Sequence, residues 1–339
     1  NYKASLALPP YLGRQKFGTT KQDSLEMRYI LGENSQPISL KASNFDAQAE
    51  LRDVGGFQDI QNEMPFYRES YMVTEKEEQQ YANYQSAENS NLANQVLRQI
   101  SKKPMNLIQG AMVVPERQIW QLLAPSDGVP KVTVKIKDKT YTIDYTTDNG
   151  AKHKEDHFVE IQGTSDKWNV PATATPLQDL IDTRRDFAKK TGYSLTRFSM
   201  NTETFEMILK AEDTKKQVLG ITAYNGGIRV RQADVLSYLR EYGIEIEVYD
   251  KMYVDESGTT QYFIPTNIIS CQSAGDYVFG RTPEERSGDL AGGNLQLVET
   301  GISVYTYATE HPINTHCVVS MIGLPSFEGM NSVVVMKVA

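Results

Sequence analysis

The segment 242–267 limits the possible folds of this chain more than any other. Apolar and polar residues alternate along 244–249, which is the pattern of a strand with one buried face. A turn of Asp, Glu, Ser and Gly follows at 255–258, and an aromatic-rich strand then ends at Pro265, because proline has no amide hydrogen to give to a ladder. The segment therefore predicts a β-hairpin packed on one side.

Length and composition fit a folded protein with more than one core. The chain has 339 residues, of which 40% are hydrophobic and 23% charged, so it is neither disordered nor fibrous. This length exceeds one typical core and predicts two domains, or one domain with large insertions. The longest apolar stretches fall short of the roughly 20 residues that a bilayer core requires.

Charge and cysteine content narrow the classes of partner. The net charge of −8 disfavours tight binding to a phosphate backbone, because that affinity comes from clustered Lys and Arg. Cys271 and Cys317 are too few for a disulfide framework and fit a reducing cytoplasm.

The first 73 residues lack the pattern of an independent core. Residues 1–24 combine prolines and glycines with scattered apolar side chains, which predicts an extended arm. Residues 25–73 contain short strand-like runs such as 37–41, broken by polar turns. A lone pair of strands is only marginally stable in water, so we expect this segment to pack on something outside itself.

A long helix follows. Thr74 and Glu77 form a capping box, in which each side chain accepts a hydrogen bond from the other residue's backbone amide. We expect this helix to end near Lys103, because Pro104 cannot continue it without strain. A second helical stretch, bent at Pro115, is expected after it.

The next segments predict strands. Val and Ile alternate with Lys from 131 to 137 and a partner run follows, which predicts a lysine-rich hairpin. Residues 146–156 are polar and predict a loop, and 158–161 predict a short strand. The valine-rich residues 331–339 predict a closing strand.

The central region alternates helices and strands, which is typical of a compact α/β lobe. A helix is expected from Thr175, with Pro176 at its first position and Gly192 as its stop. A strand at 195–200 and a helix at 202–211 are expected after it, and a further helix at 233–242.

Metal ligation finds little support in the sequence. His153 and His157 lie four residues apart, as two ligands on one helix face would, but their surroundings are loop-like and a third ligand is missing. His311, His316 and Cys317 have wider spacings than closed zinc sites. We expect no metal centre.

Catalytic and cofactor signatures are missing as well. The chain carries no phosphate-loop, dinucleotide, nucleophile-elbow or zinc-protease motif, so we expect no catalytic residues and no cofactor. Acidic residues are plentiful, and a cytoplasmic carboxylate-dependent enzyme stays open as an alternative, although no particular pair is selected.

Several of these segments together resemble a known family. Residues 66–71 read Phe-Tyr-Arg-Glu-Ser-Tyr and precede the acidic helix, 263–267 carry an aromatic-apolar-Pro-x-Asn strand end, and 331–339 form the valine-rich close. In this order they resemble the lambda-type major capsid proteins of tailed bacteriophages, from about Phe66 to the C-terminus.

The resemblance implies an α+β fold of the Hong Kong 97 type. Residues 1–24 would be the N-terminal arm and 25–73 the extended β-hairpin loop. Residues 74–172 with 306–339 would form the peripheral domain with its long helix. Residues 173–305 would form the axial α/β domain.

The implied function is that of a major capsid protein, which self-assembles through hexamers and pentamers into an icosahedral head shell around double-stranded DNA. A scaffolding protein, a portal and a decoration protein are the expected partners, with only weak contact to the packaged DNA and none to a membrane. Assembly would take place in the host cytoplasm, and the product would be the virion. An encapsulin-like compartment shares this fold and stays open as an alternative.

Two groups of residues are predicted to contact neighbouring subunits. The first lies in the loop segment, which we expect to rest on another copy. The second is the basic side of the helix that begins at Thr175, where a solvated or salt-bridged face is the alternative interpretation. The predicted contacts are Ile38, Leu40, Lys41, Phe57, Arg184 and Arg185.

Overall fold

The structure is a computed structural model of mixed α and β content, as the sequence predicts. It describes residues 11–32, 57–86, 90–136, 139–146, 150–221, 229–271, 275–287 and 294–339. The chain divides into two compact units. Unit 1 comprises Asn1–Arg28, Gln61–Ile119 and Asp276–Ser326, and unit 2 comprises Tyr29–Ile60, Trp120–Gly275 and Phe327–Ala339.

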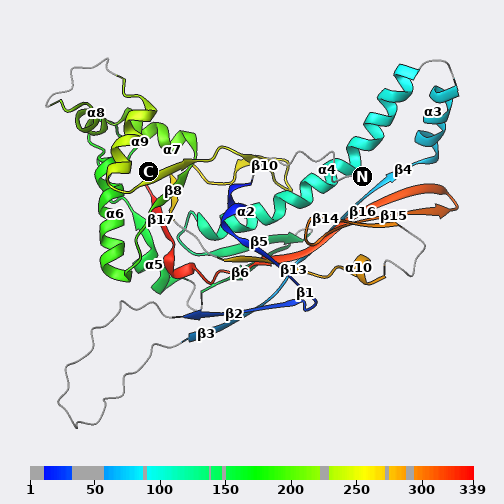
Figure 1. Ribbon diagram of the computed structural model, residues 1–339, viewed down its shortest axis with the longest axis horizontal. Coiled ribbons are helices and arrows are strands. Elements are labelled where there is room, and N and C mark those ends of the chain that lie inside the picture. The colour runs from blue at the N-terminus through cyan, green and yellow to red at the C-terminus, as the bar shows by residue number, and fades with distance from the viewer. Residues whose placement is uncertain are drawn as a thin grey trace, which may run out of the picture. The chain divides into compact units, whose positions relative to one another are not determined.

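Unit 1 is built on a six-stranded sheet with the order β1-β13-β16-β15-β14, in which β4 also pairs with β16. Its strands are β1 (Gly18–Gln22), β4 (Phe66–Val73), β13 (Asp276–Gly280), β14 (Asn294–Val298), β15 (Ile302–Glu310) and β16 (Ile313–Pro325). Figure 1 shows β15 and β16 side by side as a long antiparallel hairpin, paired from Ile302 with Met321 to Glu310 with Ile313.

One face of this sheet is apolar and buried. Val304 and Val319 are paired across β15 and β16, and they are 1% and 3% exposed. Tyr277 of β13 lies on the same core and donates a hydrogen bond to Gln118 of helix α4 (Ser90–Leu123) at 2.5 Å. The helix therefore packs on the sheet.

The capping box at the start of α3 (Glu75–Ser86) is confirmed. The amide of Thr74 donates to Oε2 of Glu77 at 3.1 Å, and the amide of Glu77 donates to Oγ1 of Thr74 at 3.4 Å. These two bonds satisfy amides that have no partner within the helix.

The predicted end of a helix near Lys103 is wrong. Helix α4 continues through both Pro104 and Pro115. A proline inside a helix costs about 3 kcal/mol. Tertiary packing offsets this cost, because α4 buries large side chains in its second half, among them Ile108, Met112, Ile119, Trp120, Leu122 and Leu123.

Unit 2 contains a five-stranded sheet with the order β7-β17-β12-β8-β9. Its strands are β7 (Phe158–Glu160), β8 (Arg197–Met200), β9 (Glu245–Val248), β12 (Ile268–Cys271) and β17 (Val334–Lys337). Figure 1 shows a group of helices beside β8 and β17. The helices of this unit are α5 (Ala151–His157), α6 (Pro176–Thr191), α7 (Thr202–Lys210), α8 (Glu212–Leu219) and α9 (Gln232–Glu241).

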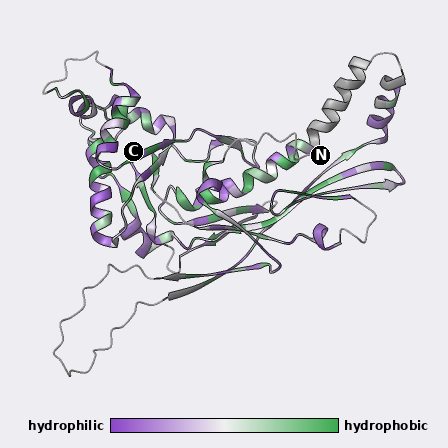
Figure 2. Cartoon of the chain, in the orientation of Figure 1, coloured by the Kyte–Doolittle hydropathy of each residue, from purple (hydrophilic) through white to green (hydrophobic). Residues whose placement is uncertain are grey.

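The helices of unit 2 are amphipathic and cover the sheet. In Figure 2, α6 carries both hydrophilic and hydrophobic colouring along its length. Its Leu177 and Leu180 are fully buried in a core that also contains Trp168 and Phe198. Gly192 ends the helix in the left-handed region with φ 80°, as the sequence predicts.

The hairpin at 242–267 is only partly confirmed. Its first strand, β9, pairs in parallel with β8, and the hairpin is formed instead by β10 (Met252–Val254) and β11 (Thr260–Tyr262). The alternation along β9 is that of a strand at the edge of a larger sheet. Periodicity reports which face is buried, but it does not report which strand is the partner.

Other local predictions have mixed outcomes. The lysine-rich hairpin is confirmed as β5 (Lys131–Ile136) and β6 (Lys139–Asp144), and the closing strand as β17. The loop expected at 146–156 is wrong in part, because α5 occupies its second half after Gly150. The remaining elements are α2 (Leu12–Lys16), β2 (Glu26–Gly32), β3 (Phe57–Glu63), α10 (Pro283–Ser287) and the short 3-10 helix η1 (Met330–Ser332).

The two units do not follow the predicted domain boundaries. Residues 276–305, expected in the axial domain, belong to unit 1, whereas 120–172, expected in the peripheral domain, belong to unit 2. Strand β4, expected in the extended loop, pairs with β16. The loop residues 33–56 lie outside the described residues, and the names of the four predicted regions stay predictions.

Candidate functional site: the anchored N-terminal segment and the exposed surfaces

Part of the predicted N-terminal arm is bound to its own unit. Within the segment 1–24, which the sequence predicts to be an extended arm, residues 12–16 form α2 and residues 18–22 form β1. The backbone amides of Gly13 and Arg14 donate to Oε1 and Oε2 of Glu116 in α4, each at 2.9 Å. Glu116 is fully buried, so these two donors compensate the loss of water around its carboxylate.

Glycine is required at position 13 by this close approach. A Cβ on Gly13 would lie 2.9 Å from Oε2 of Glu116 and 3.0 Å from Cγ2 of Ile119. Beside this contact, Arg14 forms an ion pair with Glu299 at 2.5 Å. Helix α2 is therefore anchored at two points of unit 1.

Strand β1 extends this attachment as a parallel neighbour of β13. The register runs from Gly18 opposite Asp276 to Gln22 opposite Gly280. The first four residues of β1 are exposed, so it covers little of the apolar core. Pairing and polar contacts therefore hold it, rather than side-chain burial.

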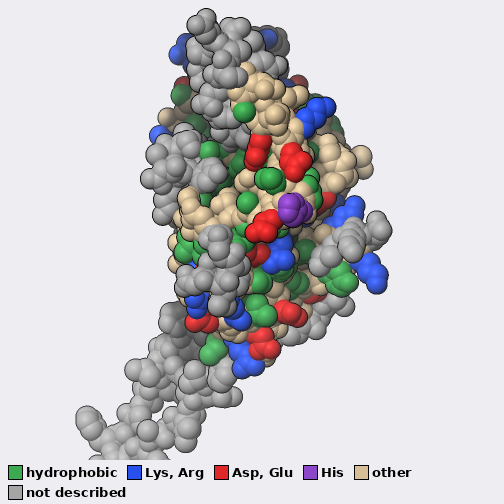
Figure 3. Space-filling view, turned by 90° about the vertical axis from the view of Figure 1, so that its right-hand side faces the viewer, with side chains coloured by type: hydrophobic (Ala, Val, Ile, Leu, Met, Phe, Trp, Pro, Cys, Tyr) green, Lys and Arg blue, Asp and Glu red, His purple; other side chains and the backbone are tan. Residues whose placement is uncertain are grey.

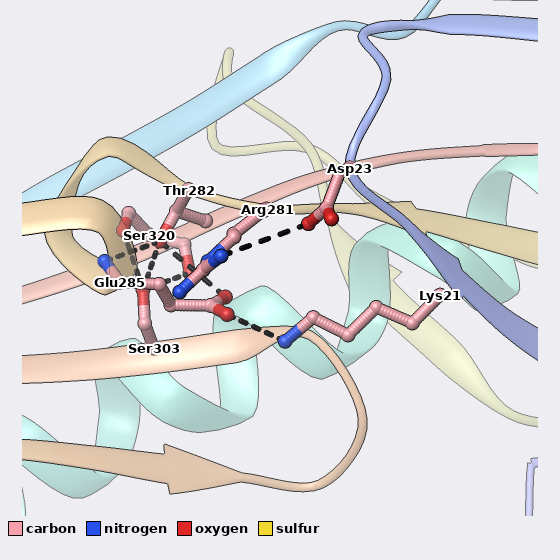
Figure 4. Close-up of polar contacts among 7 residues, drawn as sticks. All are labelled: Lys21, Asp23, Arg281, Thr282, Glu285, Ser303 and Ser320. Atoms are coloured by element: carbon pink, nitrogen blue, oxygen red, sulfur yellow. Dashed lines mark hydrogen bonds and ion pairs between the residues drawn. The ribbon is translucent and has the colours of Figure 1, made fainter.

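A polar cluster ties the end of β1 to α10 and the residues just before it. Figure 4 shows Lys21 facing Glu285, with Nζ and Oε2 2.5 Å apart, and Asp23 facing Arg281 at 3.8 Å. Arg286 also donates to the carbonyl oxygen of Asp23 at 2.9 Å. Three charged side chains from the 281–286 region thus hold one short N-terminal strand.

Beneath these ion pairs lies a buried chain of hydroxyl groups. The hydroxyl oxygens of Thr282 and Ser303 are 2.8 Å apart, as are those of Ser303 and Ser320 (Figure 4). Ser320 donates to Oε2 of Glu284 at 2.6 Å, and Glu284 forms an ion pair with Arg68 of β4. A buried polar network whose members are all paired is rigid, so it fixes α10 on the sheet.

The tip of the β15–β16 hairpin is joined to the start of α3. The amide of Ile313 donates to Oε1 of Glu75 at 2.6 Å, and the hydroxyl of Thr315 donates to Oε1 of Glu78 at 3.0 Å. The Ile313 side chain itself is 57% exposed. The hairpin tip is thus an internally braced element with an apolar residue in contact with water.

Other apolar side chains are exposed on both units. Phe66 and Met72 lie near the two ends of β4 at 42% and 40% exposure, and Met252 and Val254 share one side of β10 at 49% and 64%. On the face that Figure 3 shows, acidic and basic side chains are interspersed with hydrophobic ones. Surfaces of this mixed kind are compatible with contacts between protein molecules.

The structure does not test the predicted contact residues of the loop. Ile38, Leu40 and Lys41 lie outside the described residues, and Phe57 begins β3 but its side chain is not described. Their role between subunits stays a prediction.

The two arginines of α6 have contacts within their own unit. Arg184 is half-buried and donates from Nε to the carbonyl oxygen of Leu195 at 2.9 Å, and from Nη1 to that of Tyr242. Arg185 is exposed and forms ion pairs with Asp182 at 2.7 Å and Asp186 at 3.5 Å. Arg184 thus braces unit 2, and an interface role for either residue stays a prediction.

The structure does bring the predicted histidine pair together. The rings of His153 and His157 stack with centroids 4.5 Å apart, because α5 places them one helical turn from each other. Among the described residues, no group of three or more His, Cys, Asp or Glu side chains is arranged to hold a metal ion. Within the same residues, no helix is both long and apolar enough to cross a membrane.

Sequence reasoning missed the anchoring role of Glu116. The available signal was a carboxylate within a largely apolar helical stretch, 111–123, because a buried carboxylate requires nearby donors. The donors are two backbone amides more than a hundred residues away. The residues around Glu116 therefore give no indication of which amides these are.

Comparison with known families decides what class of protein carries these features. The model of the family described as phage major capsid protein E matches residues 7–281. This chain belongs to that family. It is a major capsid protein, a structural subunit that associates with copies of itself into a shell and is a component of the virion.

Solved structures support the same fold. A candidate capsid protein of a prophage of E. coli CFT073 is 14% identical, with a TM-score of 0.54, and the match covers 84% of this chain and 80% of that one. A phage-related protein of Bordetella bronchiseptica RB50 is 13% identical with a TM-score of 0.54, covering 99% and 94%. The capsid of Myoviridae phage XM1 is 10% identical with a TM-score of 0.50, covering 97% and 92%.

The Hong Kong 97-type capsid fold expected from the sequence is therefore confirmed. A comparison with curated proteins gave no match.

Proposed function

We propose that copies of this capsid protein gather as hexamers and pentamers in a closed icosahedral shell around the double-stranded DNA of a tailed phage. The observation that carries this proposal is the family match over residues 7–281. The exposed apolar residues on β4, β10 and the β15–β16 tip support it, because such side chains lose their contact with water when subunits meet.

Assembly of such a shell depends on many weak contacts. Each subunit meets several copies of itself, and contacts within a closed assembly reinforce one another, so no single interface has to be strong. The expected loop residues Ile38, Leu40, Lys41 and Phe57 would contribute one such contact, and Arg185 another. A scaffolding protein and a portal would direct closure, and a decoration protein would bind the finished shell.

The loop region is proposed to begin from a defined base. Strands β2 and β3 pair, and Gln61 donates to Oε2 of Glu26 at 2.6 Å. The amide of Met64 donates to the carbonyl oxygen of Leu25 at 2.9 Å. These contacts hold the two ends of the loop together. In the proposed shell, the loop extends from this base onto a neighbouring subunit.

Contact with the packaged DNA is proposed to be weak. The chain carries a net charge of −8, and release of counterions by clustered basic residues is the main source of affinity for a phosphate backbone. A weakly binding wall would leave the packaged DNA free to slide. Assembly is proposed to take place in the host cytoplasm.

The test is assembly of the full chain, expressed alone and together with the gene that precedes it. Negative-stain microscopy should show closed shells, and light scattering should show particles far heavier than one subunit. A chain that stays monomeric under both conditions would contradict the proposal and favour the carboxylate enzyme. Portal and terminase genes beside this gene would support the phage head, whereas a neighbouring enzyme with a docking peptide would support the encapsulin-like compartment.

A further inference from the structure

Helix α5 is held to the sheet of unit 2 by its last residue. His157 is 8% exposed, and its Nδ1 lies 2.9 Å from the carbonyl oxygen of Val333, directly before β17. Because a carbonyl only accepts, Nδ1 carries the proton and donates to it. The ring of Phe187 in α6 packs edge-on against this imidazole, with centroids 5.5 Å apart.

The surroundings of His157 disfavour a second proton. His153 stacks on it with an angle of 8° between the rings, so two protonated imidazoles would lie face to face. Among the described residues, the charged groups that act on it are Asp156 of α5 and Lys190 of α6. The Nζ of Lys190 lies 3.6 Å from Oδ1 of Asp156, so the two opposite charges partly cancel at the imidazole of His157. From the β17 side, the group that faces His157 is the neutral carbonyl of Val333.

Burial lowers the pKa of His157 below its ordinary value, and Lys190 acts in the same direction, against the opposing effects of the Val333 hydrogen bond and Asp156. When α5 leaves the sheet, the imidazole regains an ordinary pKa near 6.5. The undocked state then binds more protons than the docked state. Docking is therefore fully favourable above about pH 6.5 and weakens as the pH falls below that value.

The segment that follows α5 lies at the edge of the sheet, with Val159 packed half-buried against the core. Strand β7 is an edge strand that pairs in parallel with β17 over three residues, from Phe158 opposite Val335 to Glu160 opposite Lys337. An exposed ion pair of 2.7 Å between Glu160 and Lys337 adds little. A short edge strand of this kind can separate without unfolding the sheet.

We propose that α5 and β7 form an acid-sensitive flap, residues 151–160, which leaves the edge of the five-stranded sheet when His157 takes up a proton. The rest of unit 2 stays folded, because all fully buried residues of its core lie outside 151–160, which contributes only the half-buried Val159. Release uncovers the backbone edge of β17, and a free strand edge is a site where another strand can pair. This inference concerns the subunit itself and does not depend on the geometry of the shell.

Hydrogen exchange of the full chain, followed by mass spectrometry, tests the flap. After correction for the intrinsic effect of pH on exchange, protection of 151–160 should fall by up to about tenfold between about pH 7.5 and about pH 5.5, because the undocked imidazole gains one proton near pH 6.5. Protection of α7 in the same unit should stay constant. Equal protection of 151–160 at both pH values, or an equal loss in α7, would overturn the proposal.

Single substitutions test whether the imidazole of His157 causes the pH-dependent loss of protection in 151–160. His157→Asn keeps a donor for Val333 but cannot titrate, so its flap should show no pH-dependent loss of protection. His311→Asn, at an exposed position of unit 1, should behave like the wild type. A pH-dependent loss that persists in His157→Asn would refute the assignment.

If His157→Asn does not fold, the proposal can still be tested on the wild-type chain. An NMR titration of its histidine Cε1–H signals should give one pKa below the ordinary value. Four ordinary titrations would refute the proposal.

Discussion

Replacing Glu116 by glutamine should release the N-terminal segment from unit 1 without unfolding the unit. The carboxylate accepts one hydrogen bond from Gly13 and one from Arg14, each of 2.9 Å, and glutamine has only one oxygen to accept with. Its amino group would point at one of the two backbone amides, so two donors would face each other in a buried site.

The magnitude follows from these two bonds. A hydrogen bond to a charged group contributes about 1.5–3 kcal/mol and a neutral one about 0.5–1.5 kcal/mol, so the bond that glutamine keeps weakens by about 1 kcal/mol, and the donor left unpaired costs about 1–3 kcal/mol. We therefore expect the docking of 11–17 to lose about 2–4 kcal/mol in Glu116→Gln. The pairing of β1 with β13 and the ion pair of Lys21 with Glu285 do not involve Glu116, so they remain and keep β1 attached.

Hydrogen exchange and limited proteolysis measure this release directly. In Glu116→Gln the amides of 11–17 should exchange at least about 30-fold faster, since about 2 kcal/mol corresponds to that factor, and a protease should cut near Lys16. Glu206→Gln is the matched control, because Glu206 is an exposed helical carboxylate that forms an ion pair with Lys210 at 2.7 Å. Unchanged exchange of 11–17 in Glu116→Gln would refute the view that this carboxylate anchors the segment.

Three further predictions concern single positions. Ser303→Ala removes the middle hydroxyl of the buried chain, and we expect a loss of about 1–3 kcal/mol in the free energy of unfolding, seen as a lower urea midpoint; an unchanged midpoint would argue against a stabilising network. Gly192→Ala forces a Cβ into the left-handed region at φ 80°, which should cost about 1–2 kcal/mol; a gain in thermal stability would contradict this. Arg185→Glu breaks two exposed ion pairs worth at most about 1 kcal/mol, so the subunit should fold normally while shells become fewer by electron microscopy; normal shell yield would remove Arg185 from the interface.

Short-range chemistry made some elements readable from the sequence. The capping box of Thr74 and Glu77 lies within four residues, and Gly192 ends α6 through its own backbone freedom. The alternation in the lysine-rich hairpin likewise contains both the strands and their connection. The capsid fold and function followed from the order of several such segments, which resembled a family, rather than from periodicity alone.

Contacts between distant residues decided the rest. Local rules place a helix end before Pro104, yet α4 continues because its buried side chains outweigh the cost of its two prolines. The segment 11–22 carries no apolar pattern, and it is anchored by Glu116 and by its neighbour strand β13, both remote in sequence. The sequence shows what each residue requires, such as a buried face or a hydrogen-bond donor. Which other residue supplies it is determined only when the whole chain is packed.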